Sequence, residues 1–463
     1  MTSTDEGTPA FPEPDTGLLA PVRAGCPAEY TTGDHAVLQA LLDAEAALTR
    51  AQSSVGLAPA DAGRAVTAAA RADRFDLRSL ALRARDGGNP VIPLVEDLTR
   101  RIAAVDPEHA AHVHRGATSQ DIMDSALMLI ATRTLDLIIT DLLLTGDRLA
   151  GLAVAHRATP MPGRTLTQHA VPLTFGLKAA GWRSLVLDAH DRLVRVRRSL
   201  PAQLGGAAGT LAAFHEYAPD GWCAHPELVA AYAAELGLAV PGLPWHTLRA
   251  PVADLGSALA FTTGALGKIA ADVLVLSRTE IGEVTGTGGG SSAMPHKSNP
   301  VKAALIASTA RQVPALTAVL HASMAAEDER PAGAWHAEWG PLRDALRLTG
   351  GAAHHAVALT TGLTVRPERM RANLELTGGL ILSERLRARL ATSVGPAAAK
   401  ELIGRAARHA AEHGVSLADA LRRESVPLPE AELRELMDPL GYLGYAAELT
   451  DRALTRHPHQ DRR

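Results

Sequence analysis

The segment GGGSSAMPHKSNP at 288–300 combines residue types that can do chemistry on an anion. A run of glycines exposes backbone N–H groups, Lys297 adds a cation, and a helix that begins near Pro300 adds the positive end of its dipole. Ser291 and Ser292 supply hydroxyls, and such an anion site can stabilise either a serine alkoxide or a substrate carboxylate. We therefore predict a catalytic loop here.

Two other interpretations of this loop fit its residues less well. A phosphate-binding P-loop needs glycine immediately before its Lys-Ser pair, whereas His296 precedes Lys297 and Pro295 has no N–H to donate. This weakens the hypothesis of a phosphate- or nucleotide-binding module. A flexible linker does not usually carry a fixed Met-Pro-His-Lys block.

Long helical patterns must position this loop. Leucines recur at helical spacing in 34–52 behind Asp34, a predicted N-cap, and Glu45 is the one polar gap in their stripe. A similar stripe in 121–157 continues for about ten turns. Further helical patterns fill 174–200, 251–284, 300–325 and 341–362. Alternating strand patterns are almost absent, so the sequence predicts an all-α bundle of antiparallel rods.

Glycine- and proline-rich breaks separate the helical segments, at 87–93, 115–121, 159–172, 202–209 and 288–300. In the last hundred residues the helices are shorter, with Pro396 at a helix start and Gly414 just past its end. We predict a disordered tail at 1–17, an N-terminal helical domain at 18–112, a central long-helix domain at 113–362 and a C-terminal helical domain at 363–463.

The composition excludes several classes of protein. The chain has 463 residues with 46 Lys plus Arg against 50 Asp plus Glu, so no excess of charge favours nucleic acid or an anionic membrane. No charge-free apolar stretch reaches about 18 residues and no signal peptide is recognisable, so we expect a cytoplasmic protein. Cys26 and Cys223 are too few for a disulfide framework and we expect both to be buried. The 19 histidines include no HExxH set, so we predict no metal.

The block GSSAMPHKSNP resembles the signature of the aspartase/fumarase superfamily, which ends in the pattern GSSxMPxKxNP. HRGATSQD at 114–121 resembles the first signature loop of that family, and GRTLTQHA at 163–170 resembles the second. The resemblance covers nearly the whole chain after the tail. It implies an all-helical three-domain protomer, no cofactor, and a homotetramer built on a central helix bundle. It also implies active sites where the three loops meet from different subunits.

The resemblance also assigns roles to individual residues. It makes Ser291 the general base, gives substrate carboxylates to Thr118, Ser119, Lys297 and Asn299, and puts Gln168 and His114 in the lining of the site. Proton abstraction beside a carboxylate builds negative charge there, so the transition state needs a cation and several donors. A serine base must be stabilised as its alkoxide, and we expect the loop to close over substrate.

Simpler explanations of several candidates stay open. Thr118 and Ser119 could only cap the helix that begins near Asp121, and His114 could be an ordinary polar contact.

Four further residues have similar alternatives. Gln168 and His169 could satisfy backbone groups of their loop. We also place Arg330, in the segment ERPAGAWHAEW, and Arg23 at the substrate, although either could be a solvated surface charge.

Leu166 departs from the family pattern. Many members have histidine at this place in the second loop, and leucine cannot donate a proton. A hydroxide or amine leaving group needs such a donor, whereas a carboxylate, whose acid has a pKa near roughly 4, leaves unassisted. Nitrite is another weakly basic leaving group. This argues against fumarase chemistry, and less strongly against argininosuccinate or adenylosuccinate lyase chemistry.

The branch that lacks this histidine and resembles the chain most is the bacterial 3-carboxy-cis,cis-muconate cycloisomerases, as in GGNPVIPLV, ATSQDIMD and QLGGAAGTLAAF. We therefore expect a polycarboxylate substrate and lactonisation of the cycloisomerase kind. Ser298 stands where that branch has arginine, which fits a substrate with less negative charge. Nitrosuccinate lyase chemistry, which releases nitrous acid and fumarate, and other fumarate-releasing reactions stay open. A structural protein without activity is the remaining alternative, disfavoured because Ser291, Lys297 and Asn299 are present.

Overall fold

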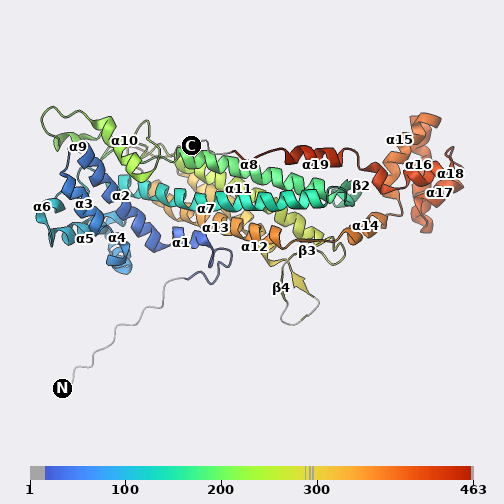
Figure 1. Cartoon of the computed structure of the whole chain (residues 1–463), viewed down its shortest axis with the longest axis horizontal. Coiled ribbons are helices and arrows are strands. Elements are labelled where there is room, and N and C mark those ends of the chain that lie inside the picture. Colours follow the sequence, from blue (N-terminus) through green and yellow to red (C-terminus); the bar gives the residue numbers. More distant parts are fainter. Residues whose placement is uncertain (1–15, 287, 291–293, 295–296, 460–463) are drawn as a thin grey trace, which may run out of the picture. The chain divides into compact units, whose positions relative to one another are not determined.

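The computed structural model describes residues 16–286, 288–290, 294 and 297–459. The predicted general base Ser291 lies outside these residues, and so does nearly all of the predicted disordered tail. Within them the chain is mainly helical, which confirms the all-α prediction (Figure 1). The structure adds three small two-stranded antiparallel sheets.

The helices fall into three groups along the chain. The long ones are α7 (Ser119–Ala155), α8 (Phe175–Ser199), α11 (Ala250–Leu276), α12 (Val301–Ala322) and α13 (Ala334–Thr361). Before and between them lie α1 (Pro27–Thr32), α2 (Asp34–Ser54), α3 (Ala60–Ala69), the 3-10 turn η1 (Ala72–Arg74), α4 (Leu77–Gly87), α5 (Val91–Ala103), α6 (Pro107–Ala110), α9 (Ala212–Glu216) and α10 (His225–Leu236). After them come α14 (Pro367–Glu375), η2 (Leu380–Leu382), α15 (Ser383–Val394), α16 (Pro396–His413), α17 (Leu417–Arg423), α18 (Glu430–Leu436), η3 (Pro439–Tyr442) and α19 (Ala446–Leu454).

Most predicted helices are present, but some of their ends differ. The N-cap of α2 is Gly33, so the prediction for Asp34 is wrong: Asp34 is the first helical residue and its carboxylate accepts a hydrogen bond from Arg343 at 2.6 Å. Helix α11 ends at Leu276 and not near 284, because the chain turns back through Gly282, whose φ is +62°. At the other end of the chain, Pro396 begins α16 and Gly414 ends it in the left-handed conformation, as predicted.

The break at 159–172 contains a hairpin that the sequence did not predict. Strand β1 (Pro160–Thr165) pairs with β2 (Gln168–Thr174), and the pair Thr165–Gln168 closes a two-residue turn. Both turn residues, Leu166 and Thr167, have positive φ, at +47° and +71°. Such a turn normally selects Asn-Gly, so this backbone is strained at the tip of the second signature loop. Proline is uncommon inside strands, so the prolines of β1 and β2 made the alternation of buried and exposed residues hard to recognise.

The remaining strands are two residues long. β3 (Val284–Thr285) pairs with β6 (Thr364–Val365), and β4 (Gly289–Gly290) pairs with β5 (Ser298–Asn299) within the third signature segment.

Backbone contacts divide the chain into two compact units. The first comprises residues up to Thr140, Arg192–Thr263 and Ser308–His355. In it, α13 approaches α1 closely, since a Cβ added at Gly350 would lie 2.3 Å from that of Ala28. The Thr317 hydroxyl of α12 donates to the Gly256 carbonyl of α11 at 3.0 Å. These contacts explain why small residues recur on these helices.

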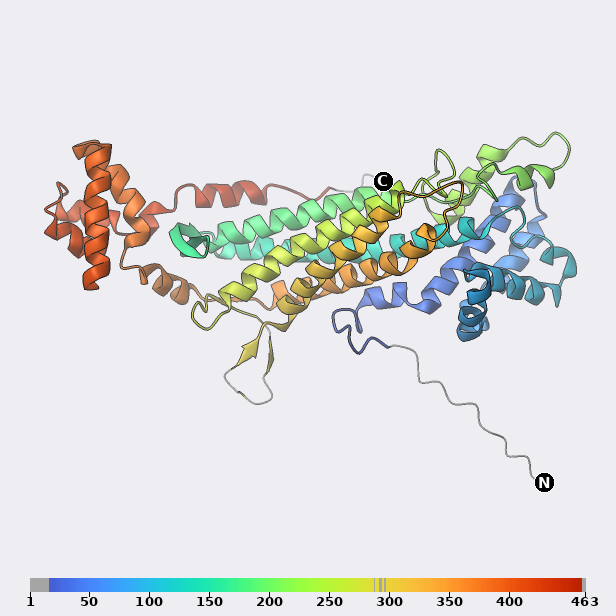
Figure 2. The same ribbon diagram turned by 180° about the vertical axis from the view of Figure 1, so that it is seen from behind.

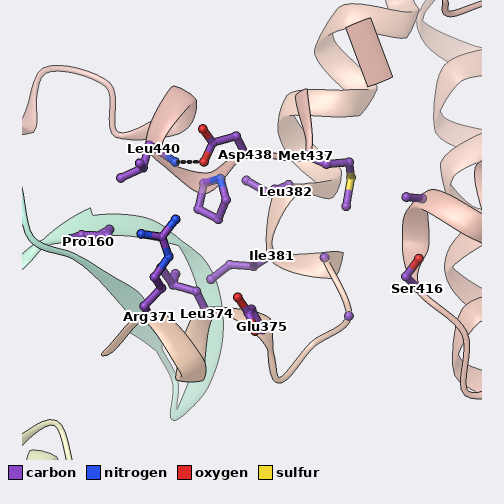
Figure 3. A pocket seen from close by; sticks show the side chains of 14 residues that line it. Pro160, Arg371, Leu374, Glu375, Ile381, Leu382, Ser416, Met437, Asp438 and Leu440 are labelled. Carbon is purple, nitrogen blue, oxygen red and sulfur yellow. Dashed lines mark hydrogen bonds between the residues drawn. The ribbon is translucent and has the colours of Figure 1, made fainter. Parts of the chain in front are cut away.

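The second unit comprises Asp141–Asp191, Gly264–Ala307 and the chain from Ala356. Helices α8 and α11 are joined by Trp182, whose indole N–H donates to Asp272 at 2.7 Å. The short helices α15 to α18 lie next to one another (Figure 2). Their buried apolar residues form a cluster of their own. A pocket between α14, η2 and η3 is lined mainly by apolar side chains such as Ile381 and Met437, with the Arg371 side chain at its edge (Figure 3).

By length and composition alone, α11 and α12 could cross a membrane. Half of the apolar window of α11 and 39% of that of α12 are buried inside the chain, and the core helices of helical bundles pass the same test. The expectation of two buried cysteines is half wrong, because Cys26 is buried but Cys223 is exposed.

Candidate active site

A carboxylate caps helix α7 where the first signature loop ends. Asp121, in the first turn of α7, accepts a hydrogen bond from the Thr118 backbone N–H at 3.1 Å, so the acidic side chain caps the helix. None of the hydrogen bonds recorded among the described residues uses the hydroxyl of Thr118 or Ser119. Capping alone therefore does not explain these two hydroxyls, which is consistent with their predicted role as ligands of a carboxylate.

Asp121 joins this loop to the glycine-rich break at 202–209. Its carboxylate is fully buried and also accepts from the backbone N–H groups of Gly205 and Gly206, each at 2.9 Å, and from His246 Nε2 at 2.8 Å. Gly206 has a φ of +72°, which a residue with a side chain rarely adopts. One buried carboxylate with four donors thus fixes the relative position of two loops.

Arg330, which we predicted to face the substrate, contacts the same two loops. Its guanidinium donates to Gln120 Oε1 at 3.1 Å and to the carbonyl of Ala207 at 3.1 Å. The Gln120 amide donates in turn to Asp124 at 3.2 Å and to the His246 carbonyl at 2.8 Å. A cation therefore lies beside the loop that carries the hydroxyls of Thr118 and Ser119.

Replacing Asp121 tests whether this carboxylate positions the loop. Asp121→Asn leaves one acceptor oxygen for four donors, so we expect kcat/KM to fall about tenfold to a hundredfold, from the roughly 1.5–3 kcal/mol that a hydrogen bond to a charged group contributes. Asp147→Asn, at an exposed position of the same helix, should leave kcat/KM unchanged. Equal values for wild type and Asp121→Asn would contradict the assigned role.

Beneath the loop, Arg249 forms the centre of a buried charge network. It is 2% exposed and donates to Asp124 at 2.7 and 3.1 Å and to Glu338 at 2.6 and 3.1 Å. Trp335 donates to Asp124 at 3.0 Å. Burial lowers the pKa of Arg249, but the two carboxylates outweigh it and raise that pKa; burial raises the pKa of Glu338 despite the arginine. Because Asp124 and Glu338 share one guanidinium, the charge of Arg249 does not fully offset the cost of burying the Glu338 carboxylate.

His114 precedes the loop and adopts a positive φ of +55°. Its Nδ1 lies 2.7 Å from Oε1 of Glu45, which is fully buried on α2. His114, Thr118, Ser119 and Arg330 thus come together within one unit of a single chain. Arg23 does not join them. It pairs with Glu29 at 3.1 Å and its Cα lies near Gly351, 13 residues and about 20 Å along α13 from Glu338.

In the second unit a buried ion pair links the second signature segment to Glu283, five residues before the third segment begins. Arg164 of β1 donates to both carboxylate oxygens of Glu283 at 2.6 and 2.9 Å, and Glu283 is fully buried just before β3. The Asn373 amide donates to the same carboxylate at 2.8 Å. Burial and the Arg164 charge lower the pKa of His169, which favours its neutral form.

The predicted substrate ligands of this unit lie on hairpins. Gln168 is exposed at the start of β2 and donates to the Thr167 hydroxyl at 3.3 Å. Lys297 is exposed, and Ser298 and Asn299 form β5 opposite two glycines of β4. The pairing is close, since a Cβ at Gly288 would lie 2.3 Å from the Asn299 carbonyl oxygen. Leu166 is 96% exposed at the hairpin tip, and its φ of +47° is uncommon for a residue with a side chain.

Several residues that hold these loops in place were not identified from the sequence: Asp121, Asp124, Glu338, Arg249, His246, Arg164 and Glu283. Asp121 and Asp124, two carboxylates one turn apart in an apolar helix, were a usable signal. His246 and Arg249 lie in a segment without periodicity and gave none. Among the described residues, no group of three or more His, Cys, Asp or Glu side chains is arranged to hold a metal ion.

Comparison with known proteins gives a consistent result. A family model described as Lyase matches residues 28–315, and one described as Adenylosuccinate lyase C-terminus matches 379–453. The chain is similar to a nitrosuccinate lyase of Streptomyces davaonensis, with 54% identity over 95% of this chain and 94% of that one. It is also similar to a 3-carboxy-cis,cis-muconate cycloisomerase of Pseudomonas aeruginosa, with 43% identity over 95% of each chain. The crystal structure of a 3-carboxy-cis,cis-muconate lactonizing enzyme from Pseudomonas putida matches with a TM-score of 0.86 and 40% identity, over 92% of this chain and 96% of that one.

Proposed function

Because the chain belongs to the lyase family of the aspartase/fumarase superfamily, we propose that it adds or removes a weakly basic group beside a carboxylate of a succinate- or muconate-like substrate. Ser291 takes the proton, and Thr118, Ser119, Lys297 and Asn299 bind the carboxylates. The site is also lined by His114, Arg330 and Gln168. Arg23 is a further substrate ligand, although it lies away from His114 and Arg330 within one chain.

One observation carries the proposal. The tip of the second signature hairpin presents Leu166, 96% exposed, where a proton donor for the leaving group is expected. A side chain that cannot protonate the departing group restricts the reaction to groups that leave as stable anions. Carboxylates and nitrite meet that condition at neutral pH, whereas hydroxide does not.

The first candidate reaction is lactonisation of the 3-carboxy-cis,cis-muconate type, the reverse of which expels a carboxylate. It is supported by the likeness to cycloisomerases in both sequence and structure. The second candidate is elimination of nitrous acid from nitrosuccinate to give fumarate. It is supported by the 54% identity to a nitrosuccinate lyase and by Ser298, an exposed neutral residue in the catalytic loop.

The assembly that we propose is a cytoplasmic homotetramer whose active sites are shared between subunits. The long helices α11 and α12 support it, because half or more of their apolar windows is not buried within one chain. We retain domain boundaries near 113 and 363, with the central domain supplying the assembly surface.

A single substrate panel separates the two candidate reactions. The purified protein is supplied in turn with 3-carboxymuconate, nitrosuccinate and adenylosuccinate, while loss of diene absorbance, nitrite and fumarate are followed. We expect turnover of a substrate whose leaving group is a weak base, and none of adenylosuccinate beyond a trace. Diene loss without nitrite identifies the first reaction, and nitrite with fumarate the second. Rapid cleavage of adenylosuccinate would overturn the leaving-group argument.

A further inference from the structure

Helix α2 carries a buried polar stripe that the catalytic mechanism above does not use. Glu45, Thr49 and Gln52 are 0%, 0% and 1% exposed, and their spacing of four and three places them on one face of the helix. Glu45 contacts the His114 ring at 2.7 Å, and the Gln52 amide donates to the Arg115 carbonyl at 2.6 Å. The polar gap in the leucine stripe is thus an attachment point for the segment that leads into the first signature loop.

The contact between Glu45 and His114 has the properties of an ion pair. A fully buried carboxylate needs a compensating charge, and Oε2 of Glu45 has no hydrogen-bond partner among the described residues. Burial lowers the pKa of His114, but the charge and hydrogen bond of Glu45, with the charge of Asp121, outweigh burial and raise that pKa. Among the described residues, the charges that act on the ring are those of Glu45 on α2 and Asp121 on α7, and both are acidic.

The geometry leaves one edge of the imidazole for another partner. Nδ1 is taken by Glu45, so Nε2–H is the remaining donor, and the side chain is 18% exposed. His114 has a positive φ, and the Ala117 N–H donates to its carbonyl at 3.2 Å, so a tight turn joins His114 to Thr118 four residues later. An imidazolium there adds a cation to two hydroxyls, a combination suited to a carboxylate.

We propose that Glu45 is a positioning residue of the enzyme, which orients His114 and holds its ring as a cation that binds a carboxylate of the substrate. The ligand class rests on the proposed function, whereas the ion pair does not. A structural hydrogen bond alone would fix the segment without fixing the charge, and these two roles can be measured separately.

The first measurement needs no substrate. Exchange of the imidazole Cε1 hydrogen with deuterium, followed against pH by peptide mass spectrometry with fragment ions ending at Arg115, reports the pKa of His114. In the wild-type protein we expect a value above the ordinary value of about 6.5. In Glu45→Gln it should fall below that value, because burial persists without the counter-charge. An unchanged pKa in Glu45→Gln would overturn the ion pair.

The second measurement uses whichever substrate the panel identifies. Because Glu45→Gln leaves a smaller fraction of His114 charged near pH 7.5, we expect it to raise KM severalfold at that pH, with a smaller effect on kcat. The wild-type KM should rise with pH through the His114 pKa, and in the variant this rise should occur at lower pH. His114→Gln should show the same KM, and the double variant no further increase.

Gln52→Ala is the matched control from the same helix face. It loosens the backbone of the segment without removing a charge, so it should change KM but leave its pH dependence as in the wild type. If Glu45→Gln behaves like Gln52→Ala, Glu45 is only structural and the proposal fails. If no substrate in the panel is turned over while the His114 pKa shifts as expected, the proposed function fails and the ion pair stands.

Discussion

Ser291→Ala should fold normally and lose turnover by at least about 10²–10⁴-fold in kcat, the usual contribution of a positioned acid or base. Alanine keeps the backbone of the loop and removes only the oxygen that takes the proton. Lys297 and Asn299 remain, so KM should change little. The measurement is kcat and KM on the panel substrate, with circular dichroism and thermal unfolding at one protein concentration as the check on folding.

Ser292→Ala is the matched control, because it makes the same change one residue further along the loop. It should keep most of the turnover if Ser291 alone is the base. Substantial activity in Ser291→Ala would sink the assignment, and the opposite pattern in the two variants would transfer the role to Ser292. Loss of activity in both would show that the loop needs each hydroxyl to stabilise the alkoxide.

The helical architecture could be predicted well because apolar residues at helical spacing identify long helices in a sequence. The three signature segments could also be recognised in the sequence by their resemblance to those of the family. Prediction failed where a segment is governed by tertiary contacts. The hairpin at Pro160–Thr174 has strained turn residues and prolines in its strands, so neither its turn nor its alternation is recognisable.

The supporting residues illustrate the same limit. Glu45 was visible as a gap in a leucine stripe, but its partner His114 is 69 residues away and no local pattern links the two. Arg249 binds Asp124 and Glu338 across 125 and 89 residues. A buried ion pair follows from the fold rather than from spacing, so such pairs emerge only once helices are placed in space.

Removing Arg249 should have the largest effect on stability. Arg249→Met takes away a guanidinium that is 2% exposed and leaves Asp124 and Glu338 buried without compensation. Breaking a buried pair in this way typically costs about 3–5 kcal/mol in the free energy of unfolding. Arg249→Lys keeps the charge but not the planar fork of the guanidinium. Its free energy of unfolding should therefore lie between those of the wild type and Arg249→Met. The measurement is thermal unfolding at fixed protein concentration.

The pH dependence of this loss tests its cause. Burial already raises the pKa of Glu338 in the wild-type protein, and Arg249→Met removes the guanidinium that opposes this rise, so the folded variant binds more protons than the unfolded chain between the two pKa values of Glu338. Stability of the variant should therefore fall as pH rises through that window, and the deficit against wild type should be smaller at pH 5 than at pH 8. The triple variant with Asp124→Asn and Glu338→Gln removes the charges and should recover part of the loss. A deficit that is independent of pH and unrelieved in the triple variant would show that Arg249 acts through packing against Trp245, 4.8 Å from its guanidinium, rather than through charge.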